Sequence, residues 1–337
     1  MPLKGKILVL RFSAMGDVAM VASVLREFSV QNTELEFIVA SRAAFKPFFN
    51  EIDRLTFHAI EPKTKHKGLI GLFKLFRELH QYKITAVADL HDNLRSRIVS
   101  TFFRFAGIKI ERIDKGRAEK RALTRTKNKV LKPLKLTVER YADVFRALGL
   151  EGQLSHRLVK SFKPLPSGII PQFKAKAVKK IGISPFAQHS FKVYPLPLME
   201  EVIAGLDALG YQLFIFGGGS SEKSIAAKWA TQFENVNNLI GNFTLSEELA
   251  IISNLDLMLS MDSAGMHIAS LMGVRVISIW GPTHPYAGFL GYGQTEADCI
   301  QSDSLNRPSS IYGNKPCNFC MDKIKPSIII NKIKENG

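Results

Sequence analysis

Short apolar runs alternate with stretches of helical periodicity along almost the whole chain. Apolar runs bounded by polar turns are typical of buried strands, and apolar residues that recur three and four positions apart are typical of helices. We expect strands at 6–10, 35–40, 84–90, 180–186, 211–219, 238–241, 256–262 and 275–281. Strands that alternate with helices form βαβ units and parallel sheets. The chain is therefore predicted to belong to the α/β class.

The intervening stretches read as amphipathic helices. We expect helices at 17–29, 68–82, 93–106, 138–148, 195–209, 221–233, 244–255 and 263–272, and a last basic helix in the tail. Thr244 and Glu247 have the spacing of a capping box, which marks a helix start. In the helix at 68–82 the helical period places five apolar side chains on one face: Leu69, Leu72, Phe73, Phe76 and Leu79.

The length of 337 residues favours two domains. A segment rich in proline and lysine at 160–180 separates two βαβ series. We therefore predict two Rossmann-like domains with parallel sheets that face a cleft, at 1–168 and 169–323, with a helix at 324–337 that returns to the first domain. Ligands of open α/β sheets bind at the carboxyl ends of the strands. Five polar segments follow such ends: Asp17, Ser184–Lys192, Gly217–Glu222, Asp262–His267 and Gly281–His284.

The net charge of +16 lies entirely in the N-terminal half. Residues 1–165 hold 32 Lys and Arg against 16 Asp and Glu, and Lys109–Lys135 alone holds 11 against 3. This asymmetry indicates a polyanionic partner, which could be a nucleic acid, an anionic membrane surface or a phosphorylated substrate. The alternative is a solubilising surface.

Targeting and cysteine signals point to a cytoplasmic protein. The first apolar run is too short for a signal peptide, and no stretch approaches the ~20 apolar residues that span a bilayer. The three cysteines do not suggest a disulfide framework. Cys317 and Cys320 have metal-ligand spacing, but no second such pair completes a zinc set, so no metal site is expected.

An acidic residue, Asp17, stands in the bend "RFSAMGDVAM" between the first strand and the first helix. A surface turn would tolerate it, and so would the floor of an active site. The residues of this bend leave both interpretations open.

The segment "LSMDSAGMHIASLMG" at 259–273 is the strongest local signal. A buried strand leads into Asp262, Ser263 and Gly265, and an apolar helix follows that contains His267. Free amides and the positive dipole at a helix start attract phosphate. Asp262 could instead be a helix N-cap, and His267 could be a core residue.

Two further loops carry weaker signals. Lys192 follows the strand that ends at Ser184 and could neutralise the phosphate of a leaving group, although a lysine near a helix start is also commonly only solvent-facing. The loop "FGGGSSE" has Glu222 where a dinucleotide fingerprint has its third glycine. The loop therefore does not match an NAD-binding fingerprint, and the alternative interpretation is a loop that lines a nucleotide site.

The order of these motifs resembles the family 9 glycosyltransferases, the ADP-heptose:lipopolysaccharide heptosyltransferases. "KILVLRFSAMGDVAMVASVLREF" is similar to that family's opening, and "VADLHDNLRSRIVSTFFRFAGIK" to its DLQGNLRS-type segment. "IGISPFAQHSFKVYPLPLMEEVIAGL" resembles the donor-loop motif. The stretch from Asn238 to Pro285 resembles the C-terminal signature most closely.

The resemblance implies a glycosyltransferase-B fold whose first domain binds the acceptor and whose second binds the nucleotide-sugar. It implies an inverting, metal-independent transfer of heptose from ADP-heptose to an inner-core sugar of lipopolysaccharide, without a cofactor. Asp17 would then be the general base, and Lys192 would be catalytic as well as bind the diphosphate. The other donor-site residues would be Ser184, Glu222, Asp262, Ser263, Gly265 and His267.

The basic N-terminal half would then contact the anionic acceptor and membrane, with Gly16, Arg95 and Arg97 at the acceptor. We expect a monomer in the cytoplasm, peripheral on the cytoplasmic face of the inner membrane. One alternative is a glycosyltransferase-B enzyme with another nucleotide-sugar or acceptor. The other is a basic nucleic-acid-binding protein, which the lack of interleaved aromatic residues disfavours, so no nucleic-acid partner is expected.

Overall fold

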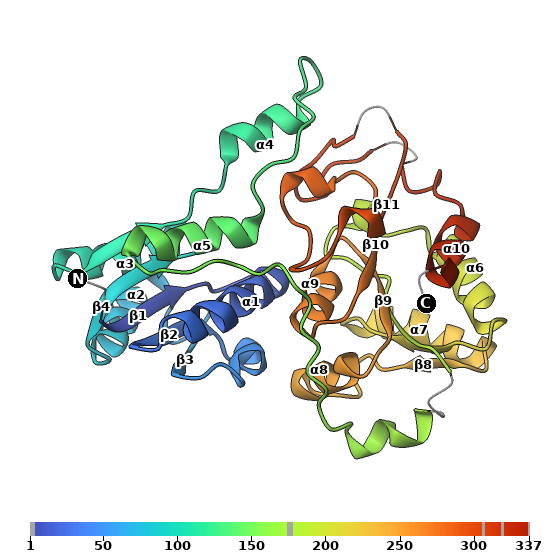
Figure 1. Ribbon diagram of the computed structural model, residues 1–337, viewed down its shortest axis with the longest axis horizontal. Helices are drawn as coiled ribbons and strands as arrows, with labels where there is room; N and C mark the ends of the chain where they lie inside the picture. Colours follow the sequence, from blue (N-terminus) through green and yellow to red (C-terminus); the bar gives the residue numbers. More distant parts are fainter. Residues whose placement is uncertain (1–3, 174–177, 305–306, 318–319, 336–337) are drawn as a thin grey trace. The chain divides into compact units, whose positions relative to one another are not determined.

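The computed structural model describes residues 4–173, 178–304, 307–317 and 320–335. Its contacts divide the chain into two compact units (Figure 1): unit 1 comprises 1–116 and 135–155, and unit 2 comprises 117–134 and 156–337. This division differs from the expected boundary at 168 in two places. The segment 156–168 belongs to unit 2, and so does the excursion 117–134, which interrupts the N-terminal half.

Unit 1 is built on a parallel sheet with the strand order β3-β2-β1-β4-β5 within the described residues. Its strands are β1 (Gly5–Leu10), β2 (Leu35–Arg42), β3 (Leu55–Ile60), β4 (Ile84–Asp89) and β5 (Lys109–Arg112). The central strand β1 is fully buried from Ile7 to Leu10, because helices cover both faces of a parallel sheet and such strands are apolar throughout.

The helices of unit 1 cover the two faces of this sheet. They are α1 (Met15–Gln31), the 3₁₀ turn η1 (Ala43–Phe49), α2 (Gly68–His80), α3 (Leu94–Phe105) and α5 (Thr137–Leu148). α1 packs against α5, and α2 packs against α3. α5 ends at Leu148, and its C-cap residue Gly149 takes the left-handed conformation that stops a helix at low steric cost.

The buried face of α2 includes only part of the apolar face that the sequence predicts. Leu72, Leu75 and Leu79 pack into the core with Leu8 and Leu10, and Phe76 is partly buried beside them. Leu69 and Phe73, which the helical period placed on the same apolar face, are exposed. A period of 3.6 residues leaves the exact centre of a broad apolar stripe undetermined.

Unit 2 is built on a second parallel sheet, with the order β11-β10-β9-β6-β7-β8 in the described part of the chain. Its strands are β6 (Lys180–Ser184), β7 (Gln212–Ile215), β8 (Val236–Asn238), β9 (Leu257–Met261), β10 (Val276–Trp280) and β11 (Cys299–Gln301). The register aligns Ser184 at the end of β6 with Ser260 of β9, so the segments that follow these two strands begin side by side.

The helices of unit 2 are α4 (Arg117–Thr124), α6 (Leu196–Asp207), α7 (Ser220–Gln232), α8 (Leu245–Ser253), α9 (Ala264–Leu271) and α10 (Pro326–Glu335). Short 3₁₀ turns complete it: η2 (Ser167–Gln172), η3 (Ser190–Lys192), η4 (Pro285–Ala287) and η5 (Glu296–Asp298). α10 packs against α6 and buries Ile329 and Ile333 in the core of unit 2. The helix expected at 324–337 is therefore grouped with unit 2.

Of the helices in the described ranges, none combines the length and the apolar character that a membrane crossing requires.

Candidate active site

Each sheet has one point where the strand order reverses. In unit 1 the chain runs outward from β1 to β3 and then returns to β4, which lies beside β1. In unit 2 it runs from β6 to β8 and returns to β9, which lies beside β6. At such a switch point the segments that follow the two central strands diverge to opposite faces, and a crevice forms at their carboxyl ends. Of the predicted site residues, Asp17 and Asp262 follow such strands, and Ser184 is the last residue of β6.

In unit 1, Asp17 lies in the first turn of α1 and is partly exposed. Arg11 Nη2 lies 2.5 Å from Oδ2, and the Ala14 amide donates to the same oxygen at 3.3 Å. The Tyr141 hydroxyl, from α5, donates to Oδ1 at 3.5 Å. Arg11 also donates to the Leu90 carbonyl at 2.7 Å. The carboxylate is therefore held in one orientation by elements from both sides of the switch point.

The segment after β4 forms the other side of this site. Asp89 is fully buried, and its Oδ1 accepts from the amides of His91 (3.2 Å) and Asp92 (2.8 Å). Asp92 in turn pairs with Arg97, at 2.5 Å from Oδ1 to Nε. Arg95 is exposed beside it at the start of α3. The expected acceptor residue Arg97 therefore has an acidic partner, whereas Gly16 is buried in the first turn of α1.

His91 is a neutral residue of this site. Its Nδ1 accepts from the Phe12 amide at 3.3 Å, so that nitrogen carries no proton. Burial first, and then the nearby charges of Arg11 and Lys115, lower the pKa of His91 from 6.5 to about 3, against the opposing effect of Asp17. The imidazole therefore acts as a hydrogen-bond acceptor at neutral pH.

The low pKa of His91 predicts an acid-sensitive fold. Below pH 6.5 the unfolded chain binds a proton at this position and the folded chain does not, so stability is lost as the pH falls from about 6.5 towards 3. At pH 5 the loss due to His91 amounts to about 2 kcal/mol. Urea unfolding at pH 7 and pH 5 measures it: H91Q should lose about 2 kcal/mol less than the wild type between the two pH values. Equal losses in both proteins would contradict the assignment, and H80Q, at an exposed histidine, should behave like the wild type.

In unit 2, Lys192 and Asp262 form an ion pair. Nζ of Lys192 lies 2.8 Å from Oδ2 of Asp262, and both side chains are mostly buried. They are 70 positions apart and come from the segments that follow the two central strands. The N-cap of α9 is Ser263, so Asp262 is not the cap residue. The structure thus brings together two of the predicted donor-site residues.

The start of α9 lies against the end of β6. A methyl group on Gly265 would overlap the Ser184 side chain, so the two backbones approach more closely than any larger residue permits. The first amides of α9 have no partner within the helix. This part of the site therefore combines free amides, a helix dipole and the nearby Lys192 cation, which is the chemistry that binds phosphate.

Substitution of Gly265 by a larger residue should destabilise unit 2. G265A forces Ser184 and the start of α9 apart and should lower the stability of unit 2 by about 1–3 kcal/mol. Both tryptophans, Trp229 and Trp280, lie in unit 2, so their fluorescence during urea unfolding reports on this unit. G218A is the matched control, because a methyl group there meets nothing within 4 Å. A G265A protein as stable as G218A would show that the close approach is not required.

The other residues of unit 2 that the sequence indicated are Glu222, His267 and His284. Glu222 lies in the first turn of α7, where its Oε2 accepts from the Gly218 amide at 2.7 Å and holds the glycine loop after β7. His267 is buried within α9. His284 follows β10, and its Nδ1 accepts from the Tyr286 amide at 3.1 Å. Burial, together with Arg307 and Lys129, lowers the pKa of His284 to about 4.

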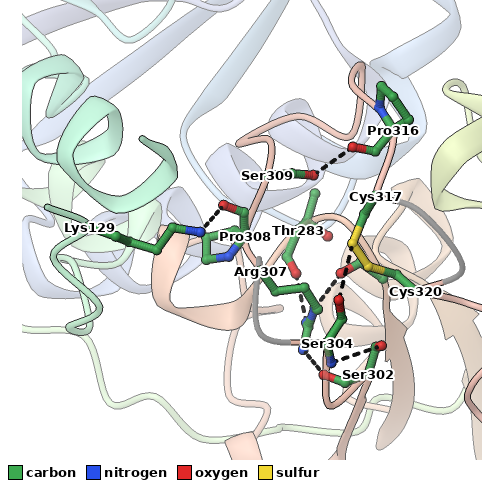
Figure 2. Close-up of a disulfide and its surroundings, with 11 residues drawn as sticks. Lys129, Thr283, Ser302, Ser304, Arg307, Pro308, Ser309, Pro316, Cys317 and Cys320 are labelled. Carbon is green, nitrogen blue, oxygen red and sulfur yellow. Dashed lines mark hydrogen bonds between the residues drawn. A yellow bond between two sulfur atoms is a disulfide. The ribbon is translucent and has the colours of Figure 1, made fainter. Parts of the chain in front are cut away.

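A buried arginine organises the loop after β11 (Figure 2). Arg307 donates to the carbonyl oxygens of Gly281, Ser302 (2.5 Å) and Thr283 (2.7 Å). Burial lowers its pKa to about 10. The same loop reaches Lys192, because a methyl group on Gly313 would overlap the Lys192 stem. Sequence reasoning missed this loop, whose role depends on contacts with residues distant in the chain.

Cys317 and Cys320 are paired as a disulfide in this loop (Figure 2). The sequence did not suggest a disulfide, because cysteine number and spacing leave the pairing undetermined. Among the residues that the structure describes, no three His, Cys, Asp or Glu side chains are grouped as a metal site.

Part of the basic segment 109–135 packs against other residues of unit 2. The Lys120 ammonium lies 4.2 Å from the centre of the Phe289 ring, and Lys129 Nζ donates to the Pro308 carbonyl at 3.0 Å. Leu123 and Leu134 are buried beside Ala287. These contacts make 117–134 a structural part of unit 2, which its basic composition did not indicate.

The two parallel sheets, each with its switch point, define an α/β protein of the glycosyltransferase-B type. The model of glycosyltransferase family 9 (heptosyltransferase) matches residues 72–308, and the chain belongs to this family. The resemblance seen in the sequence is thereby confirmed.

Individual relatives are distant. The chain is 26% identical over 166 residues to lipooligosaccharide heptosyltransferase 2 of Campylobacter jejuni subsp. jejuni serotype O:6; the match covers 47% of this chain and about half (51%) of that protein. The fold is similar to that of a family 9 glycosyl transferase from Veillonella parvula, with a TM-score of 0.75, 18% identity and coverage of 99% and 98% of the two chains. It is also similar to E. coli heptosyltransferase WaaC with ADP, with a TM-score of 0.71, 16% identity and coverage of 98% and 100%.

Proposed function

We propose that this protein is an inverting, metal-independent glycosyltransferase that moves heptose from ADP-heptose to an inner-core sugar of lipopolysaccharide. The observation that carries the proposal is the Lys192–Asp262 ion pair at the start of α9, beside the switch point of unit 2. Membership of family 9 supports heptose as the transferred sugar, the structure of WaaC with ADP supports the nucleotide of the donor, and the name of the Campylobacter relative supports the acceptor class.

Unit 2 would bind the donor. The leaving ADP carries two phosphates, and its charge grows as the sugar–phosphate bond breaks. The amides at the start of α9 and the Lys192 ammonium can offset that charge. Lys192 would then exchange part of its contact with Asp262 for the diphosphate, and Glu222, through the glycine loop, would lie towards the nucleoside.

Unit 1 would supply the base. Inversion by a single displacement requires one carboxylate to accept the proton of the attacking acceptor hydroxyl. Asp17 is the candidate, because Arg11 and Tyr141 hold its carboxylate in a fixed orientation at the carboxyl end of β1. Arg95 and Arg97 would contact the anionic groups of the acceptor.

The proposed acceptor indicates where in the cell the protein would act. We expect a monomer that works in the cytoplasm at the inner face of the inner membrane, where a growing lipopolysaccharide core presents phosphates and carboxylates. The positive charge of residues 1–165 favours contact with such a surface.

A donor panel tests the proposal. Purified protein is titrated with ADP-heptose, UDP-sugars and GDP-sugars, with binding measured by thermal shift and transfer to core acceptors measured by mass spectrometry. ADP-heptose should give the largest shift and a product heavier by one heptose, with the anomeric configuration inverted in its NMR spectrum. Transfer only from another nucleotide-sugar would show that ADP-heptose is not the donor. The absence of transfer from every donor tested would refute the proposed glycosyltransferase function.

A further inference from the structure

Four large apolar side chains in the first two turns of α2 and at the start of α3 are exposed. They are Leu69 (68% exposed), Ile70 (88%), Phe73 (48%) and Leu94 (76%), and we name them the α2/α3 apolar face. Single exposed apolar residues are ordinary, but a group of them on neighbouring helices marks an interaction surface.

These side chains are not part of the hydrophobic core of unit 1. α2 already buries Leu72, Leu75 and Leu79 against the sheet. Phe73 contacts Phe102 of α3 edge to face, with ring centres 5.4 Å apart, and this contact joins the two helices. The apolar face therefore lies on the outer side of the α2–α3 pair, away from the sheet.

The position of this face relates it to the unit 1 site. Helices that follow parallel strands run back antiparallel to them, so the first turns of α2 and α3 lie at the carboxyl edge of the sheet. Figure 1 shows the two helices beside the strands of unit 1. Leu94 is only two positions from Asp92, which pairs with Arg97. The apolar face is thus at the same edge as Asp17.

Exposed basic side chains accompany the apolar ones: Lys67, Lys74, Arg77 and Arg95. The one acidic residue in the sequence of α2 and α3 is Glu78, and its carboxylate contacts Lys65 and His66, at 3.0 and 3.2 Å. The exposed surface of the two helices is therefore both apolar and cationic.

We propose that the α2/α3 apolar face inserts into the headgroup region of an anionic lipid bilayer, while the surrounding cations contact lipid phosphates. This inference rests on the proposed function, because it supplies the reason for an acceptor site at a membrane surface. Apolar side chains combined with Lys and Arg are the pattern that binds anionic membrane interfaces. A second copy of the chain is a poorer occupant, because a two-fold contact would place these like charges against each other.

Vesicle sedimentation of the full chain tests this surface. The wild type should bind vesicles of phosphatidylcholine with 30% phosphatidylglycerol, and bind far less to phosphatidylcholine alone or in 0.5 M NaCl. L69Q/I70Q should reduce partitioning by about tenfold or more. The control V30Q/V159Q removes two similarly exposed valines elsewhere and should bind like the wild type.

A second pair of variants tests the charge. K74Q/R77Q should weaken binding to anionic vesicles by about tenfold, whereas K323Q/K325Q, which removes the same charge from unit 2, should not. Equal binding by L69Q/I70Q and its control would overturn the proposal. So would a wild-type dimer that L69Q/I70Q dissociates in analytical ultracentrifugation, because the face would then join two copies.

Transfer to a soluble acceptor shows whether the docking-face proposal and the proposed glycosyltransferase function fail independently of each other. With a delipidated core oligosaccharide, L69Q/I70Q should keep the wild-type kcat/KM, since neither residue belongs to the proposed site. Loss of vesicle binding with unchanged transfer to the oligosaccharide supports the docking face. Vesicle binding as proposed, in a protein that transfers no sugar to any acceptor, would refute the function and leave the docking face standing.

Discussion

D17N should reduce kcat for heptose transfer by about 10²–10⁴-fold and leave the affinity for ADP unchanged. Asn keeps the size of the side chain and its contact with the Ala14 amide, but it cannot accept a proton from the acceptor hydroxyl. The donor residues belong to unit 2, whereas Asp17 belongs to unit 1. Single-turnover transfer and calorimetric titration with ADP measure the two quantities separately.

D53N is the matched control for Asp17. It makes the same change of charge in unit 1 at an exposed turn, and it should leave both quantities at wild-type values. Thermal unfolding shows whether D17N is folded. A folded D17N protein with wild-type kcat would identify Asp17 as a structural residue of the first turn of α1, and the base would have to be sought elsewhere.

K192M should weaken ADP binding by about 10–100-fold and lower kcat/KM further. The ammonium is lost from the start of α9, and Asp262 is left with an uncompensated buried charge that repels the diphosphate. The effect should depend on the phosphates: ADP should lose more affinity than AMP, and adenosine should lose little. Calorimetric titration of the three ligands measures this gradient.

The control for Lys192 is K228M, which removes an exposed cation from α7 of the same unit. It should bind all three ligands as the wild type does. An equal loss for adenosine and ADP in K192M would mean that the substitution disrupts the pocket rather than the contact with phosphate, and would remove Lys192 from its proposed role.

The alternation of strands and helices could be predicted because most of the strands are buried and apolar throughout. β3, β5 and β11 were missed. β3 and β5 are largely half-exposed, and β5 and β11 have only four and three residues, so neither burial nor length distinguishes them in the sequence. The excursion 117–134 was missed for another reason. Its place in unit 2 depends on contacts with residues near 286 and 308, which local composition cannot reveal.

The residues of the candidate sites also fall into those that the sequence could predict and those that it could not. The rule that ligand residues follow the strands of a parallel sheet indicated Lys192 and Asp262 as members of one site, and the structure pairs them. The same rule could have found Arg11, which directly follows β1, and His91, which follows β4. Tyr141 had no sequence signal, because it reaches Asp17 from a helix 124 residues further along the chain.

A crystal structure of the protein with ADP tests the central claim most directly. We predict that the diphosphate lies against the amides of Ser263–Gly265 with the Lys192 ammonium within hydrogen-bond distance of a phosphate oxygen. ADP bound at the carboxyl edge of the unit 1 sheet, or elsewhere in unit 2 away from the start of α9, would contradict it.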